Sequence, residues 1–237
     1  MAVWKSRETE AHQRHYDGSL PTEVKAAIRD NRVLDQGLLC AYTLRRIGKV
    51  MWGGEITWDA HVEHVVTRKS SKARGALDET VSYDNLVACV DRGAGLPYGA
   101  SVRGDTEETL PVHPFHSTCA HRFEFHPNGT ITGRDAQATA TINKLKLDHD
   151  DLNTQRRARL AERGIGIPRS PSPNVKKLTP PQISAPEARR RAKEALEFDA
   201  EGKLPEFCVA LAQVYEQHAQ RVEKRRRDLA FARSQNN

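Results

Sequence analysis

Apolar residues recur at helical spacing near the start of the chain, where Pro21-Thr22-Glu23 precedes a stripe formed by Val24, Ala27 and Ile28. Proline in the first turn and glycine just past the end are typical limits of a helix, which predicts a helix ending before Gly37. Two short apolar runs follow at residues 38–44 and 56–66, with glycines between them. Runs of this length bounded by turn residues predict two strands paired as a β-hairpin.

The middle of the chain combines loop signals with short structured segments. Residues 67–82 are polar and predict a loop, whereas residues 83–90 place capping residues before an apolar run and predict a helical turn. Residues 123–125 and 130–132 flank Pro127-Asn128-Gly129, a turn sequence that predicts a second hairpin. Residues 136–163 carry apolar positions typical of helix in pieces.

The C-terminal part begins with a proline-rich stretch. Six of the twelve prolines lie between Pro168 and Pro186, which predicts a linker at 167–186. Residues 187–198 and 205–231 each carry an apolar stripe and predict two helices. The patterns together predict an α+β protein divided into an N-terminal helical extension at 1–34, a core at 35–135, a helical segment at 136–166, the linker, and basic helices at 187–237.

Charge is distributed unevenly along the 237 residues. The net charge of +6 combines −1 over residues 1–150 (19 basic, 20 acidic) with +7 over residues 151–237 (18 basic, 11 acidic). The C-terminal excess lies in three basic runs, at residues 156–159, 189–191 and 224–227. Such runs favour phosphate backbones, although a solvated helix face has the same composition.

Several protein classes are excluded by composition. No stretch approaches the roughly 18 unbroken apolar residues of a membrane span, and the N-terminus lacks the apolar region of a secretory signal. A cytoplasmic protein without membrane contact is therefore expected. The four cysteines, Cys40, Cys89, Cys119 and Cys208, form no CxxC pair, so their spacing does not support a structural zinc site.

The residues best suited to chemistry are Glu63, His64 and Asn85. A neutral imidazole at His64 can take a proton from water, and a neighbouring carboxylate at Glu63 can hold a divalent cation against a phosphate. The side-chain amide of Asn85 can orient the imidazole. Consecutive strand residues project to opposite faces, so this site requires the strand to end or bulge at His64.

The chain as a whole resembles the PtuB-like HNH endonucleases of bacterial anti-phage defence, found in Septu systems and with some retrons. The resemblance covers most of residues 35–210 and is carried by residues 35–42, Glu63-His64 with Arg68-Lys69, residues 83–89, 119–125, 140–147 and 204–208. It implies an HNH (ββα-metal) nuclease core at 35–135, flanked by helices, that hydrolyses phosphodiester bonds of DNA or RNA.

The resemblance also implies roles for individual residues. His64 becomes the general base, Asn85 its orienting residue, and Glu63 a metal ligand or the residue that orients one. Arg68, Lys69 and Arg103 become contacts to nucleic acid. The third ligand is left open among Asp91, Asp105 and His113, with Asp91 preferred. The expected cofactor is Mg²⁺ or Mn²⁺, and the expected partners are a PtuA-like ABC-type ATPase and, in retron versions, a reverse transcriptase with its DNA–RNA hybrid.

Departures from the family pattern keep two alternatives open. Thr43 stands where the first knuckle commonly has its second cysteine, and the partner of Cys89 is also replaced, so structural Zn²⁺ is not expected. The degraded knuckles and the missing third ligand fit a catalytically decayed HNH-fold adaptor. The C-terminal charge fits a basic nucleic-acid-binding subunit without catalysis.

Overall fold

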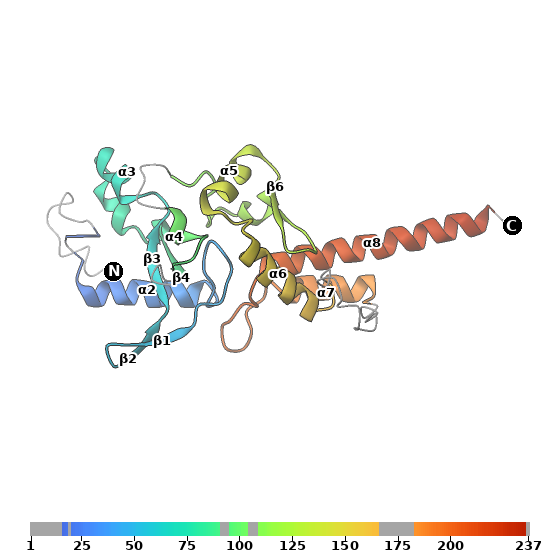
Figure 1. Cartoon of the computed structure of the whole chain (residues 1–237), viewed down its shortest axis with the longest axis horizontal. Coiled ribbons are helices and arrows are strands. Elements are labelled where there is room, and N and C mark those ends of the chain that lie inside the picture. Colours follow the sequence, from blue (N-terminus) through green and yellow to red (C-terminus); the bar gives the residue numbers. More distant parts are fainter. Residues whose placement is uncertain (1–15, 19, 91–94, 104–108, 166–182, 236–237) are drawn as a thin grey trace.

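The computed structural model describes residues 16–18, 20–90, 95–103, 109–165 and 183–235. It is a mixed α+β structure, as the sequence predicts, with small antiparallel sheets and a long C-terminal helix (Figure 1). No helix in these ranges is long and apolar enough to cross a membrane. The helices are α2 (Thr22–Asp35), α3 (Arg68–Ala73), α4 (Ala100–Arg103), α5 (Ala136–Leu145), α6 (Asp150–Glu162), α7 (Ala185–Glu194) and α8 (Cys208–Ser234).

The strands form three antiparallel pairs among the described residues. They are β1 (Lys49–Trp52) with β2 (Glu55–Trp58), β3 (Ala60–His64) with β4 (Leu86–Val90), and β5 (Phe123–Phe125) with β6 (Ile131–Gly133). The β5–β6 pair confirms the hairpin predicted around Asn128-Gly129. The part of the chain that the structure describes also contains three short 3₁₀ turns, Leu77–Val81, Tyr83–Asn85 and Cys119–Arg122.

The predicted hairpin between residues 38–44 and 56–66 is wrong. Residues 40–44 form a turn, in which Leu44 has a φ of 59°, and only Leu39 makes a bridge, to Arg46. The hairpin lies later, where Gly53 and Gly54 adopt positive φ between β1 and β2. Residues 38–40 are apolar because they are buried in the core. A short apolar run in the sequence looks the same whether it forms a buried turn or a strand.

The predictions for residues 67–90 also need correction. Residues 86–90 form β4 rather than a helical turn, and residues 86–89 are fully buried. A strand without an exposed face shows no apolar–polar alternation, so its sequence reads equally well as helix. The predicted loop at 67–82 contains α3, which is capped by the Thr67 hydroxyl accepting from the backbone N–H of Ser70 at 3.2 Å.

The described residues form three hydrophobic clusters. The largest joins α2, the turn at 38–47, β3, β4, β5, β6 and α5 to the start of α8, and it includes Phe207. The second packs α6, α7 and α8 together through Leu160 and Tyr215. The third is formed by Leu20, Ile28, Val81 and Leu86. The C-terminal part of α8 extends beyond α7 (Figure 1), and the predicted linker lies mostly at residues 166–182, outside the described residues.

Candidate active site

His64 is the last residue of β3, opposite Leu86 on β4. Its Nε2 lies 3.0 Å from the backbone carbonyl oxygen of Thr80. Because a carbonyl oxygen only accepts, Nε2 carries the hydrogen, and the lone pair of the neutral ring belongs to Nδ1. The Thr80 carbonyl thus fixes one tautomer, and that tautomer can take up a proton at Nδ1.

The surroundings of His64 hold the ring in its neutral form. Burial lowers the pKa of the imidazole from its ordinary 6.5 to about 4, although the Thr80 hydrogen bond acts in the opposite direction. The ring of Tyr16 covers it edge-on, with centroids 4.7 Å apart, and the Tyr16 backbone N–H donates to the Thr80 hydroxyl at 3.1 Å. His64 is therefore neutral at pH 7, but it is a weaker base than an exposed histidine.

Glu63 points away from His64, to the other face of the sheet. Its Oε1 lies 2.9 Å from Nε2 of His61, which occupies the same face two residues earlier, and its Oε2 lies 3.7 Å from Nη1 of Arg103. The register is regular through this part of the strand, with Glu63 opposite Val87. The strand end therefore does not bring Glu63 and His64 to one face as the sequence interpretation requires.

Arg103 lies inside the fold, at the end of α4. Its guanidinium donates to the Tyr42 hydroxyl at 2.9 Å and to the carbonyl oxygens of His64 and Val65, each at 2.5 Å. Its side chain is 1% exposed. The prediction that Arg103 contacts substrate phosphate needs correction, because these donors already bind two successive backbone carbonyls, those of His64 and Val65.

Asn85 also acts on the backbone rather than on the imidazole. Its Oδ1 accepts from the Val66 N–H at 2.7 Å, and its Nδ2 donates to the carbonyl oxygens of Val66 and Glu79 at 3.1 and 3.0 Å. The predicted hydrogen bond from Asn85 to the His64 ring is therefore wrong. Asn85 instead fixes the chain just after His64 to the 3₁₀ turn that carries Thr80.

The predicted nucleic-acid contacts Arg68 and Lys69 lie on α3. Arg68 forms an ion pair with Asp17, and Lys72 lies 3.5 Å from the same carboxylate. Partial burial acts to raise the pKa of Asp17, but the two cations outweigh it and hold that pKa below its ordinary value. Lys69 is exposed on the same short helix. Residues 16–17 thus lie over both His64 and the basic residues of α3.

The described residues do not form a metal centre beside His64. Within these ranges no group of three or more His, Cys, Asp or Glu side chains is arranged to hold a metal ion. Glu63 already faces Arg103 and His61, and His61 Nδ1 is buried without a hydrogen-bond partner. Asp91 and Asp105 lie outside the described residues. His113 stacks at an angle on Phe115. A divalent cation does not fit these surroundings as they stand.

Cys40 and Cys89, the two cysteines that remain of the family's knuckle positions, lie in contact with each other. The Cys40 thiol hydrogen-bonds with Cys89 and with Thr43, and both thiols are fully buried. Burial acts to raise the pKa of Cys40, but these bonds and one from the Val90 backbone lower it to about 5. Two sulfurs and a hydroxyl are fewer ligands than the four of a tetrahedral zinc site.

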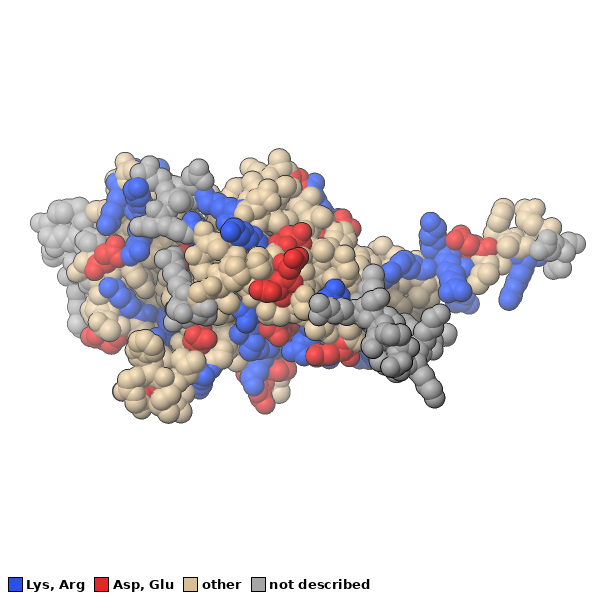
Figure 2. Space-filling model, viewed as in Figure 1, with Lys and Arg blue, Asp and Glu red and all other residues tan. Residues whose placement is uncertain are grey.

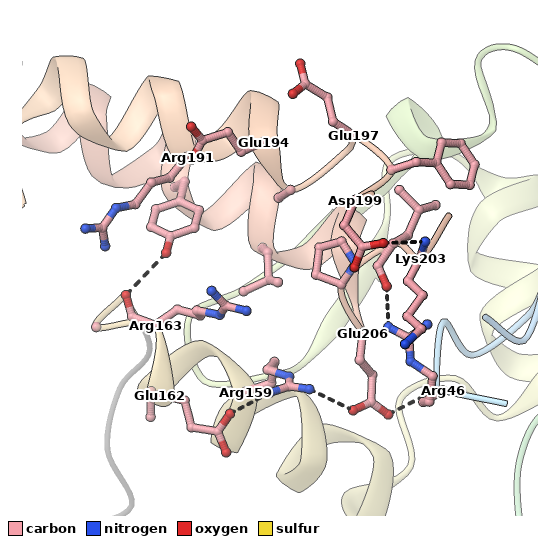
Figure 3. A pocket seen from close by; sticks show the side chains of 18 of the residues that line it. Arg46, Arg159, Glu162, Arg163, Arg191, Glu194, Glu197, Asp199, Lys203 and Glu206 are labelled. Carbon is pink, nitrogen blue, oxygen red and sulfur yellow. Dashed lines mark hydrogen bonds and ion pairs between the residues drawn. The ribbon is translucent and has the colours of Figure 1, made fainter. Parts of the chain in front are cut away.

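A pocket of about 940 Å³ lies elsewhere, between α6, α7, α8 and the segment before α8 (Figure 3). It shares no residue with the surroundings of His64. Five basic and five acidic side chains line it, among them Arg159, which lies between Glu162 and Glu206. The lining therefore has no net preference for an anion or a cation, and we assign it no ligand.

The sequence does not identify Tyr16 or Thr80. It offers His61 as a possible ligand beside Glu63, because residues two apart on a strand share a face, although it favours a polar residue at the strand edge. Tyr16 reaches His64 from 48 positions earlier, which no local pattern indicates. No protein-family model matches this chain, and no curated protein matches its sequence.

Proposed function

We propose that this protein is an HNH-type endonuclease subunit that hydrolyses phosphodiester bonds with His64 as general base. The observation that carries the proposal is the His64–Thr80 hydrogen bond, which fixes a neutral imidazole with its lone pair on Nδ1. Further support comes from the order of elements, since paired strands β3 and β4 are followed by α4, the order expected of a ββα core.

The proposed step is attack of water on phosphorus. A water O–H bond breaks, its proton passes to Nδ1 of His64, a P–O bond forms, and the leaving ester oxygen departs with a proton from solvent. Arg103 holds the carbonyl of His64 and Asn85 holds the backbone of Val66, so both are positioning residues for the end of β3. The expected Mg²⁺ or Mn²⁺ stays a prediction from the resemblance, and no step here uses it.

The biological setting of the proposal also comes from the resemblance. It places the subunit in a bacterial anti-phage complex controlled by an ABC-type ATPase, with a reverse transcriptase and its DNA–RNA hybrid in retron versions. Control by a partner agrees with the contacts of Tyr16 and Asp17, which cover His64 and occupy Arg68 in the chain alone.

The test is cleavage by the full chain co-purified with its ATPase partner. Pools of DNA and RNA are incubated with wild type, His64→Ala and, as a matched control, His126→Ala, which removes a half-exposed histidine ring that bonds to the Thr132 hydroxyl. Loss of general-base catalysis lowers the rate by about 10²- to 10⁴-fold in His64→Ala only. Cleavage by His64→Ala at the wild-type rate would contradict the assignment of His64 as general base. A parallel reaction with EDTA tests whether cleavage requires a divalent cation.

A second candidate function is a non-catalytic adaptor that retains the fold. It is favoured by Glu63, whose carboxylate faces Arg103 and His61, and by the commitment of Asn85 to the backbone. An adaptor binds its partner yet leaves DNA and RNA intact with Mg²⁺ or Mn²⁺ present. Cleavage that depends on His64 excludes it.

A further inference from the structure

The three basic runs of the C-terminal part differ in what their side chains contact. In the first, Arg156 is buried and donates to the carbonyl oxygen of Gly129 and to Oδ1 of Asn153, at 2.9 and 2.8 Å. Arg159 pairs with Glu162 at 2.8 Å and with Glu206 at 3.5 Å (Figure 3). The first run therefore stabilises the fold.

The second run, at residues 189–191, is also neutralised. Arg189 forms a two-pronged ion pair with Glu223 of α8, with one bond of 2.9 Å. Arg190 and Arg191 both pair with Glu187, each at 2.7 Å. The Arg189–Glu223 pair holds α7 against α8, and the pairs with Glu187 lie within α7, so the charge of the second run is balanced by neighbouring carboxylates.

The third run, at residues 224–227, is different. All four side chains are exposed, and none makes a hydrogen bond or ion pair with another residue that the structure describes. The nearest influence is on Glu223, where Arg189 and, after it, Arg227 lower the carboxyl pKa. Figure 2 shows these cations on the part of α8 that projects from the body.

The shape of this segment indicates what it could bind. We call residues 221–233 the α8 arm; beyond Glu223 every one of its residues is exposed. Successive helix residues lie about 100° apart, so four consecutive cations surround the helix instead of forming one charged side. A helix is about 10–12 Å across, and the B-DNA major groove is about 12 Å wide with phosphates on both walls.

We propose that the α8 arm binds duplex DNA by entering the major groove and contacting phosphates on both sides. Cations around the whole circumference match anionic walls on both sides, whereas a flat acidic protein surface would use only one side. A second copy of the arm would place like charges together. The inference deepens the proposed function by adding a duplex-DNA contact, and it needs no catalysis at His64.

The test is the salt dependence of DNA binding by the full chain. Fluorescence anisotropy is measured with a labelled 20-base-pair duplex in EDTA, with His64→Ala as background so that no cleavage occurs. The arm variant carries Lys224→Gln, Arg225→Gln, Arg226→Gln and Arg227→Gln; glutamine keeps helix propensity, which circular dichroism checks. Each lost phosphate contact reduces the slope of log K against log salt by about 0.9, so the slope falls by about 3 to 4.

A matched control separates the arm from total charge. Lys49→Gln, Arg134→Gln, Lys146→Gln and Lys193→Gln remove four exposed cations outside the arm. This variant keeps the wild-type slope if the proposal is correct. An unchanged slope in the arm variant, or an equal fall in the control, overturns it.

Duplex RNA provides a third measurement, because the deep, narrow A-form major groove does not admit a helix. Weaker RNA binding supports insertion into the groove, and equal binding overturns it. The two proposals fail separately. If the arm binds DNA but no cleavage occurs, only the nuclease proposal is rejected. If cleavage depends on His64 but the arm variant keeps the slope of log K against log salt, only the proposal for the α8 arm is rejected.

Discussion

At the scale of single residues, the candidate site depends on the contacts that set the tautomer and the pKa of His64. His64 donates from Nε2 to Thr80 and is covered by Tyr16, and both partners come from segments distant in sequence. The sequence indicated His64 because of its residue type and neighbours. It could not indicate its tautomer or its lowered pKa, which are set by contacts across 16 and 48 positions.

The pKa of His64 has a consequence for stability. Its folded pKa of about 4 lies below the ordinary 6.5, so between these values the unfolded chain binds a proton that the folded chain does not. Stability is therefore full above pH 6.5 and falls as the pH drops towards 4, by about 3 kcal/mol for this group. Urea unfolding of wild type and His64→Gln over this range measures the difference.

A direct reading of the same group comes from NMR titration of the His64 ring. Tyr16→Ala lets water reach the imidazole, so its pKa rises towards 6.5. His126→Gln serves as the control for both measurements, since that ring lies on the surface of the β5–β6 hairpin. A pKa near 6.5 for His64 in the wild-type protein would contradict the conclusion that its ring is buried and held neutral.

Asn85 provides a separate residue-scale prediction. Asn85→Ala removes three hydrogen bonds and leaves the half-buried N–H and carbonyl of Val66 without their partner, which costs about 2–4 kcal/mol, whereas the Glu79 carbonyl keeps the Ser82 N–H. Asn31→Ala, at an exposed position of α2, is the control. Chemical unfolding distinguishes this role from the orienting role expected from the sequence, in which stability would change little.

At the scale of elements, amphipathic segments were predictable and fully buried ones were not. The helices now seen as α2, α6 and α8 carry apolar stripes at helical spacing, and Asn128-Gly129 marks a hairpin turn. Residues 86–90 face protein on both sides, so their uniform apolar character hides the strand. The turn at residues 40–44 is apolar for the same reason.

The β5–β6 turn gives a prediction at this scale, because it packs directly on α6. Gly129 has a φ of +90°, and a Cβ there would lie 2.1 Å from the Asn153 carbonyl oxygen. Gly54 has nearly the same φ, +87°, but no atom within 4 Å of such a Cβ. Gly129→Ala therefore costs well over the roughly 1–2 kcal/mol of backbone strain expected for Gly54→Ala. Thermal unfolding of the two variants compares them, and equal losses would contradict the close approach.

At the scale of the whole molecule, the structure distinguishes the basic side chains of the C-terminal part that are paired within the fold from those that are exposed. Composition alone placed +7 in residues 151–237 without distinguishing the three basic runs. The arginines at 156 and 159 and those at 189–191 bind carboxylates or carbonyl oxygens. The sequence cannot show the contacts of Arg156, Arg159 and Arg189 with Gly129, Glu206 and Glu223, because these partners lie on other elements. The exposed charge is therefore concentrated on the α8 arm, away from His64.

The length of α8 has a consequence of its own. Its 27 residues, at about 1.5 Å each, extend about 40 Å, and its free end lies at the opposite end of the molecule from β3 (Figure 1). A nucleic acid that touches both the arm and His64 must span that separation. Fragments shorter than this span would contact either the arm or the surroundings of His64, but not both. The length of the products would then be set by the distance between these two parts of the protein, not by base sequence.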